Sequence, residues 1–134
     1  MSEFAEAEAG IRQLYARYAD AVWRKDAQAF GACFAKDGQW RIAGMVLQGR
    51  AAISEAIARI LAGANRVLMT FQTPILDLED GSRASARVYV TEQCSWADGR
   101  SNLNIGRYYD RIIAQDGQWR FDWRLFQALY TGPA

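Results

Sequence analysis

Glu92 is the first side chain in the sequence with the setting of a catalytic group. Every second residue from Ala84 to Trp96 is apolar except Glu92, and alternate residues of a strand share one face. A carboxylate buried in such a row has its pKa raised by desolvation, which suits a general acid or base. Two structural interpretations stay open: an ion pair with Arg107 or Arg124 on a neighbouring strand, or a bulge that turns Glu92 toward solvent.

Tyr18 is the second candidate, because it lies on the apolar stripe of a predicted helix. A buried tyrosine hydroxyl normally finds a partner. That partner could be Glu92 or Asn104 in the core, or an oxygen atom of a substrate, which the hydroxyl would polarise. Tyr108 and Tyr109 alternate on the third long predicted strand, so only one of them can point inward.

Arg124 lies on the last predicted strand, and the direction of its side chain decides between two arrangements of that strand. If Arg124 points into a pocket, the alternate row of Trp119, Phe121 and Trp123 is exposed unless a partner covers it. This arrangement predicts a homodimer or a higher homo-oligomer. If the aromatic row instead forms the core, Arg124 is a surface residue.

The residue types that are missing narrow the chemistry. The chain has no histidine, which excludes Ser-His-Asp and Cys-His nucleophile systems and the usual histidine-based zinc and iron sites. Of the two cysteines, Cys33 falls on the buried side of a predicted helix, and Cys94 lies near Glu92, whose charge disfavours the thiolate. Phosphate-binding glycine loops, paired-cysteine sites and calcium loops are absent from the sequence. We therefore expect no metal and no cofactor.

Length and composition indicate one globular domain over residues 1–134. Hydrophobic residues make up 51% of the chain, and 16 basic residues against 15 acidic ones are interleaved. No nucleic-acid footprint is visible in this pattern. There is no apolar run long enough for a membrane helix and no signal-peptide pattern. We expect a reduced, cytoplasmic protein with no nucleic-acid or membrane partner.

The elements that must position these side chains come in two groups, helices first. Apolar residues recur at three- and four-residue spacing from Ile11 to Val22 and predict an amphipathic helix of about five turns that includes them. Asp26 is the predicted N-cap of a shorter helix that ends near residues 37–38. A small hairpin turns at Ala43 and Gly44, and a third helix ends at Gly63.

From residue 67 onward the apolar period changes to two. Strands are predicted over 67–78, 83–96, 103–114 and 119–130, and three Asp-Gly turns connect them. Short connections require a largely antiparallel sheet. Helices followed by a meander give an α+β domain in which the helices cover one face of the sheet.

Several segments, taken in order, carry a family resemblance. They are IRQLYARYADA (11–21), DAQAFGACF (26–34), DGQW (37–40), LQGRAAI (47–53), GRYYD (106–110) and DGQWRF (116–121). This series resembles the SnoaL-like branch of the nuclear transport factor 2-like superfamily over nearly the whole chain. The resemblance implies a cone-shaped α+β fold: three N-terminal helices packed on a strongly curved, mainly antiparallel sheet that encloses a pocket.

The resemblance also implies which catalytic groups to look for. Dehydratase and dehydrochlorinase members use an aspartate near the end of the first helix and a histidine after the third helix. These fall on Trp23 and on or beside Met69 or Thr70, so the family dyad is absent here. The arginine on the last strand of the dehydrochlorinase has a counterpart in Arg124, and the first-helix tyrosine of ketosteroid isomerase matches Tyr18.

We therefore predict a small-molecule pocket protein of the SnoaL-like type that binds an apolar, cyclic or aromatic ligand. As an enzyme it would be a cofactor-independent lyase or isomerase, with Glu92 as the base and Tyr18 or Arg124 stabilising an oxyanion. The expected substrate contacts are Trp23, Trp40, Met69, Thr70, Asn104 and Tyr109. The alternative is a non-catalytic ligand-binding or assembly subunit, similar to the small subunits of ring-hydroxylating dioxygenases.

Overall fold

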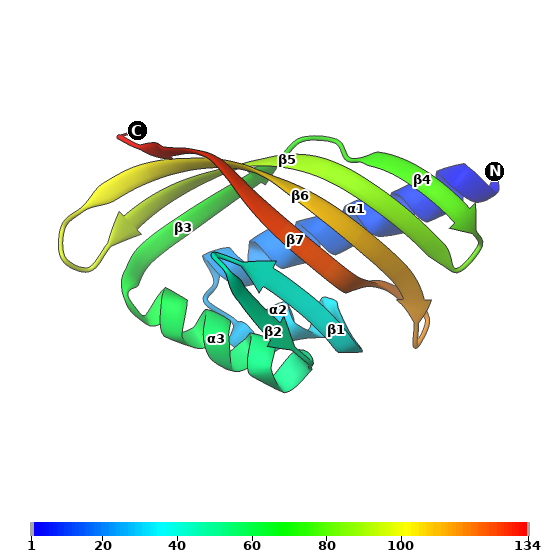
Figure 1. Cartoon of the computed structure of the whole chain (residues 1–134), viewed down its shortest axis with the longest axis horizontal. Coiled ribbons are helices and arrows are strands. Elements are labelled where there is room, and N and C mark those ends of the chain that lie inside the picture. Colours follow the sequence, from blue (N-terminus) through cyan, green and yellow to red (C-terminus); the bar gives the residue numbers. More distant parts are fainter. Residues whose placement is uncertain (1, 134) are drawn as a thin grey trace.

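A computed structural model describes residues 2–133 of the chain (Figure 1). Helices come first, and most of the sheet follows them. The elements in chain order are α1 (Glu3–Trp23), α2 (Ala27–Ala32), β1 (Phe34–Ile42), β2 (Met45–Gln48), α3 (Arg50–Ala62), β3 (Ala64–Phe71), β4 (Ile75–Asp80), β5 (Arg83–Trp96), β6 (Ser101–Gln115) and β7 (Gln118–Gly132).

Helices α1 and α2 each begin where a nearby side chain satisfies a free backbone N–H group. The Ser2 side chain accepts a hydrogen bond from the Ala5 N–H at the start of α1. Asp26 does the same for Ala29 at the start of α2, as predicted. However, α2 ends at Ala32 rather than near residue 38, because the following residues form β1 and pair with β7.

All seven strands form one sheet in the order β2-β1-β7-β6-β5-β3, and β4 also pairs with β5. Pairing is antiparallel except between β1 and β7. The predicted single strand over 67–78 is wrong. It is divided into β3 and β4 around Pro74, which has no N–H to donate to a ladder.

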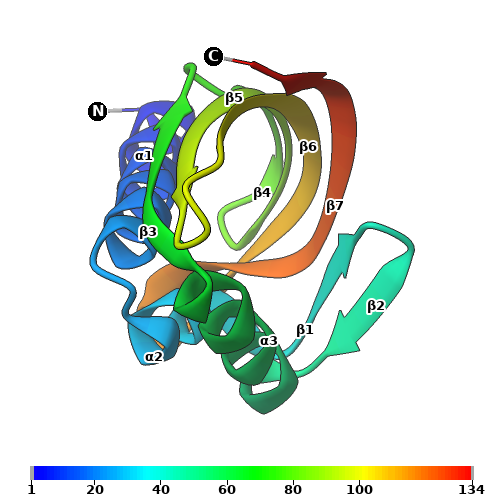
Figure 2. The ribbon, with the colours of Figure 1, turned by 90° about the vertical axis from the view of Figure 1, so that its left-hand side faces the viewer.

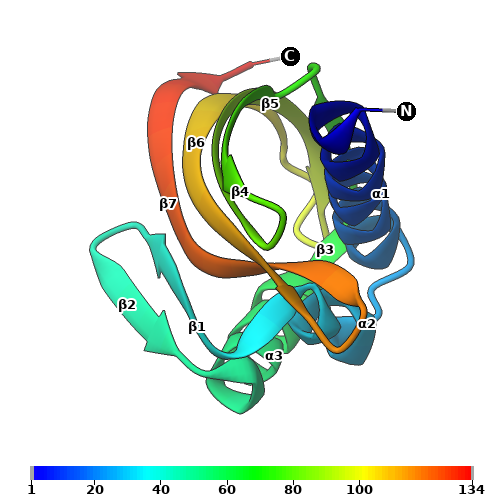
Figure 3. The ribbon, with the colours of Figure 1, turned by 90° about the vertical axis from the view of Figure 1, so that its right-hand side faces the viewer.

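The sheet is strongly curved, and all three helices contribute side chains to the core against it. Figures 2 and 3 show β5, β6 and β7 bending round, with α1 along one side and α2 and α3 at the lower end. The predicted cone-shaped α+β architecture is confirmed. No helix within residues 2–133 combines the length and the apolar character needed to cross a membrane.

A bulge in β7 resolves the orientation of Arg124. Trp123 pairs with Arg111 and Phe121 pairs with Ile112, so Asp122 is an extra residue in β7. The bulge shifts the alternation, and both Phe121 and Arg124 are fully buried. The expectation of two separate rows, one aromatic and one basic, is therefore wrong.

Candidate functional site

A cavity of about 150 Å³ lies between the helices and the curved sheet. Its walls are mostly apolar, and its polar side chains are few. The lining residues are Tyr18, Val22, Phe30, Trp40, Ile42, Ile57, Ile60, Leu61, Val67, Met69, Glu92, Cys94, Trp96, Asn104 and Tyr108. A larger hollow of about 460 Å³ lies at Tyr109, Arg111 and Trp123. Unlike that hollow, the cavity is lined largely by side chains of the core, which is the usual setting of a ligand site.

Glu92 borders the cavity from β5. The β5–β6 register is continuous there, with Asn104 directly opposite Glu92, so no bulge turns the carboxylate outward. Among residues 2–133 no cation lies within salt-bridge distance of Glu92. Burial raises the pKa of Glu92, and the Asn104 amide and the charge of Arg124 oppose this shift. The setting is that of a desolvated carboxyl group beside an apolar space.

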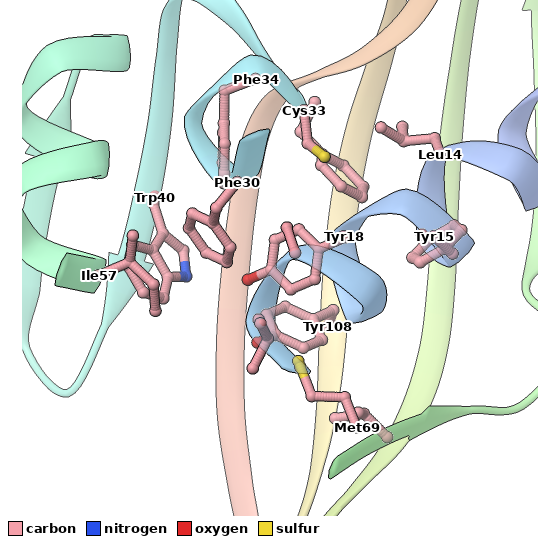
Figure 4. Packing of buried hydrophobic residues seen from close by; sticks show 14 of the residues in the cluster. Leu14, Tyr15, Tyr18, Phe30, Cys33, Phe34, Trp40, Ile57, Met69 and Tyr108 are labelled. Carbon is pink, nitrogen blue, oxygen red and sulfur yellow. The ribbon is translucent and has the colours of Figure 1, made fainter. Parts of the chain in front are cut away.

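Two tyrosine hydroxyls reach the same space. Tyr18 comes from α1 and Tyr108 from β6, and both side chains are fully buried. Figure 4 shows both hydroxyl oxygens on the side of the ring that faces Trp40. Burial is the main cause that raises the pKa of each hydroxyl, and the charge of Arg124 opposes it. Both tyrosines therefore stay protonated at neutral pH and can act as hydrogen-bond donors.

Trp40 supplies a third donor from β1. Its indole ring is buried beside Phe30, with the ring centroids 5.2 Å apart. The indole nitrogen is also buried, and no atom of residues 2–133 accepts a hydrogen bond from it. Trp40 was expected as a substrate contact, but whether its N–H has a partner could not be read from the sequence.

Arg124 lies behind the two tyrosine rings rather than among the residues that line the cavity. It makes a bidentate ion pair with Asp110, with Nε–Oδ1 and Nη2–Oδ2 distances of 2.8 and 3.0 Å. The Tyr15 hydroxyl donates to the same carboxylate at 2.5 Å. These three groups form one buried charged network in the middle of the core.

Sequence reasoning missed Asp110 and Tyr15. The available signal was the same one that identified Glu92: Asp110 shares a strand face with Tyr108 and Ile112, which are both buried. An acidic residue in that row requires a buried partner. Arg124 stands opposite Asp110 in the β6–β7 pairing.

The structure sorts the six expected substrate contacts into two groups. Trp40, Met69 and Asn104 line the cavity. Trp23, Thr70 and Tyr109 do not, which corrects the expectation for them. Trp23 is 49% exposed at the end of α1, and Thr70 and Tyr109 occupy the strand faces opposite Met69 and Tyr108.

The described part of the chain holds no group of three or more His, Cys, Asp and Glu side chains placed to bind a metal ion. The cavity instead combines three hydrogen-bond donors with one desolvated carboxyl group. Such a set can bind an oxygen atom of a ligand and accept a proton from carbon.

Comparisons with known proteins agree with this fold. The sequence model of the SnoaL-like domain family matches residues 3–124 of this chain. Among solved structures, a candidate scytalone dehydratase from Novosphingobium aromaticivorans superposes with a TM-score of 0.92 at 18% identity, covering 98% of this chain and 90% of that one. A hexachlorocyclohexane dehydrochlorinase from Novosphingobium barchaimii gives a TM-score of 0.87 at 15% identity, covering 98% and 92%.

A protein of unknown function from Mycobacterium tuberculosis is 30% identical, with a TM-score of 0.81 and coverage of 90% of this chain and 74% of that one. A comparison with curated protein sequences finds no match.

Proposed function

Because the chain belongs to the SnoaL-like domain family, a family of small-molecule pocket proteins, we propose that it catalyses proton transfer within a bound cyclic or aromatic compound. The reaction would be an isomerisation, elimination or hydration that needs no cofactor. One observation carries the proposal: the carboxyl group of Glu92 borders the apolar cavity that the Tyr18 and Tyr108 side chains also line.

In the proposed reaction, Glu92 removes a proton from a carbon atom next to a carbonyl group of the ligand. The electron pair of the broken C–H bond moves to the carbonyl oxygen, which becomes an enolate oxygen. A hydroxyl group of Tyr18 or Tyr108 donates a hydrogen bond to that oxygen and stabilises the charge. The enolate then re-forms its C=O bond. In an isomerisation, its electron pair moves through a neighbouring C=C bond, and the far carbon of that bond takes the proton from Glu92. In an elimination, the electron pair forms a C=C bond, the bond from carbon to the β-hydroxyl group breaks, and that hydroxyl group takes the proton from Glu92 and leaves as water. Hydration is the reverse of this elimination.

The raised pKa of Glu92 suits this role, because a base works best when its pKa approaches the working pH. Arg124 acts on the reaction through other groups. Its cation lies against the Tyr18 and Tyr108 rings and its charge opposes the rise in their pKa. We assign Arg124 as a positioning residue for the two hydroxyls.

Two structural neighbours are named as a dehydratase and a dehydrochlorinase, and at 18% and 15% identity they support the fold alone. The positions of the family dyad supply no base here, because Trp23, Met69 and Thr70 carry no side chain that can accept a proton at neutral pH. In this chain the base would therefore come from β5.

Hydrogen–deuterium exchange tests the proposal. The protein is incubated in D₂O with cyclohexanone and related cyclic ketones, and loss of the α-proton signals is followed by ¹H NMR. We expect Glu92→Gln to slow exchange by about 100-fold or more, while Glu79→Gln, an exposed carboxylate on β4, leaves it unchanged. Exchange at the uncatalysed rate with wild-type protein, or an unchanged rate with Glu92→Gln, would overturn the proposal.

A non-catalytic role is the second candidate, and a feature of the outer sheet surface favours it. Arg41 and Arg111 lie over the Trp123 ring, at 5.8 and 5.2 Å from its centroid, and Arg107 lies over Tyr109 at 5.2 Å. Arginine and aromatic side chains are enriched at protein interfaces. A chain that binds ketones without exchanging their protons, and that associates with a second protein, would support an assembly subunit.

A further inference from the structure

The indole nitrogen of Trp40 has no hydrogen-bond acceptor, and this is the observation from which the inference starts. The nitrogen is buried, and the acceptors within residues 2–133 do not reach it. Buried polar atoms in native proteins are almost always paired, because an unpaired donor loses its bond to water without replacement. An unpaired donor beside a cavity therefore points to an acceptor that the protein chain does not supply.

The place where that acceptor must lie follows from the lining of the cavity. Trp40 lines it from β1, and Tyr18 lines it from α1. Figure 4 shows the indole nitrogen and the Tyr18 hydroxyl oxygen facing one another across the space below Phe30. The indole N–H can only donate, whereas the tyrosine hydroxyl can rotate and also donates readily. Two donors that face the same space fit one oxygen atom with two lone pairs.

The other walls limit what can be attached to that oxygen. Phe30, Ile57, Val67 and Met69 surround the space with apolar surface. A cavity of about 150 Å³ with such walls takes up a molecule the size of benzene. The space therefore fits a single ring.

We infer that the ligand is a monocyclic carbonyl compound, and that Trp40 determines specificity by donating its indole N–H to the carbonyl oxygen. The inference rests on the proposed function for the location of the site, and it adds the class of ligand and the group that recognises it. It does not depend on Glu92, which stands on β5, outside this pair of donors.

The test observes the indole N–H directly in ¹H–¹⁵N correlation spectra. The chain has five tryptophans, and the Trp40 signal is identified by its loss in Trp40→Phe. The probes are cyclohexanone and methylenecyclohexane, which have nearly the same shape but differ in the carbonyl oxygen. We expect cyclohexanone to move the Trp40 signal downfield, and methylenecyclohexane to leave it without a downfield shift.

Affinity provides the second measurement. Trp40→Phe should weaken cyclohexanone binding about fivefold, the usual effect of losing one neutral hydrogen bond, and should leave methylenecyclohexane binding within twofold. Trp123→Phe is the matched control, because that tryptophan lies on the opposite face of the sheet. If Trp40→Phe fails to fold, the wild-type signal is assigned by nuclear Overhauser contacts to Phe30, and its shift alone decides.

Repeating the titration with Glu92→Gln separates this inference from the proposed function. A downfield Trp40 shift in both proteins, without proton exchange in the wild type, would sustain the inference and overturn the proposed function. Proton exchange without a Trp40 shift would overturn the inference and sustain the proposed function. Equal binding and equal shifts for the two probes would also overturn the inference.

Discussion

The guanidinium carbon of Arg124 lies 3.6 Å from the centroid of the Tyr108 ring, closer than to any of the four other rings around it. A cation against an aromatic face is attracted by the electrons of the ring, and the attraction grows when water is excluded. The remaining Arg124 nitrogen, Nη1, has no hydrogen-bond acceptor among residues 2–133 and lies among these aromatic rings. Arg124 thus fixes the ring that carries one of the cavity hydroxyls.

Replacing Arg124 should strongly destabilise the protein. Arg124→Met leaves the carboxylate of Asp110 buried with only the Tyr15 hydroxyl as a partner, and breaking a buried pair in this way costs about 3–5 kcal/mol. Urea denaturation measures the change. Arg111→Met, which removes an exposed arginine that also lies over an aromatic ring, should cost less than about 1 kcal/mol. Equal losses for the two variants would contradict a special role for the buried pair.

The rate of proton exchange should depend on pH through Glu92. The base must be deprotonated, and burial raises its pKa above that of a free carboxyl group. We therefore expect the rate to rise with pH through this raised pKa and then to stay level, because the chain has no histidine to titrate. A pH–rate profile with cyclohexanone checks this. A rate that falls as pH increases would contradict the assignment of Glu92 as the base.

Glu92 should also make the protein less stable as pH rises. Its pKa is higher in the folded state than in the unfolded chain, so between the two values the folded state holds more protons. The contribution of Glu92 to the free energy of unfolding therefore falls as pH increases above about 4.3, the ordinary pKa of a glutamate side chain. The measurement is the stability difference between wild type and Glu92→Gln across this range. A difference that does not change with pH would contradict the folded-state shift.

Cys94 should react slowly with thiol reagents although it borders the cavity. Burial raises the pKa of the Cys94 thiol to about 11, and the charge of Glu92 makes a smaller contribution in the same direction. Alkylation by iodoacetamide at neutral pH, followed by peptide mass mapping, measures the rate. We expect Glu92→Gln to accelerate labelling of Cys94 and to leave Cys33 unchanged, since Glu92 does not affect the Cys33 thiol. Rapid labelling of Cys94 in the wild type would contradict this expectation.

The expected homodimer or higher homo-oligomer remains a prediction, with a smaller apolar surface to support it. Phe121 is buried, and Trp119 packs against the core beside Gly10 of α1, so the exposed aromatic row reduces to the half-buried Trp123. Sedimentation velocity of wild type and Trp123→Glu is the test, with Trp23→Glu, at the exposed end of α1, as the control. We expect only Trp123→Glu to lower the mass. A monomeric wild type would contradict the prediction.

Local patterns predicted the elements that depend on local chemistry. Asp26 caps α2 as expected, and the turn at Asp116 and Gly117 adopts positive φ angles of 56° and 76° between the paired residues Gln115 and Gln118. These features depend on side chains and backbone within a few residues of one another. The placement of Glu92 also followed from one strand alone.

Features that depend on a partner strand were not predictable in this way. The end of α2 is set by pairing of β1 with β7, and the facing of Arg124 by a bulge against β6. The unpaired state of the Trp40 nitrogen depends on everything that surrounds it. Each of these features depends on contacts between segments that are distant in the sequence, and the spacing of apolar residues within one segment does not predict such contacts.

The extra residue in β7 has no partner of its own on β6, which makes position 122 tolerant of loss as well as of substitution. Asp122→Ala keeps the bulge, so Phe121 and Arg124 both stay in the core. Deleting Asp122 would remove the bulge and leave Phe121 and Arg124 two positions apart, and strict alternation would then still place both side chains on the same face. A codon lost at this one place should therefore leave Arg124 opposite Asp110.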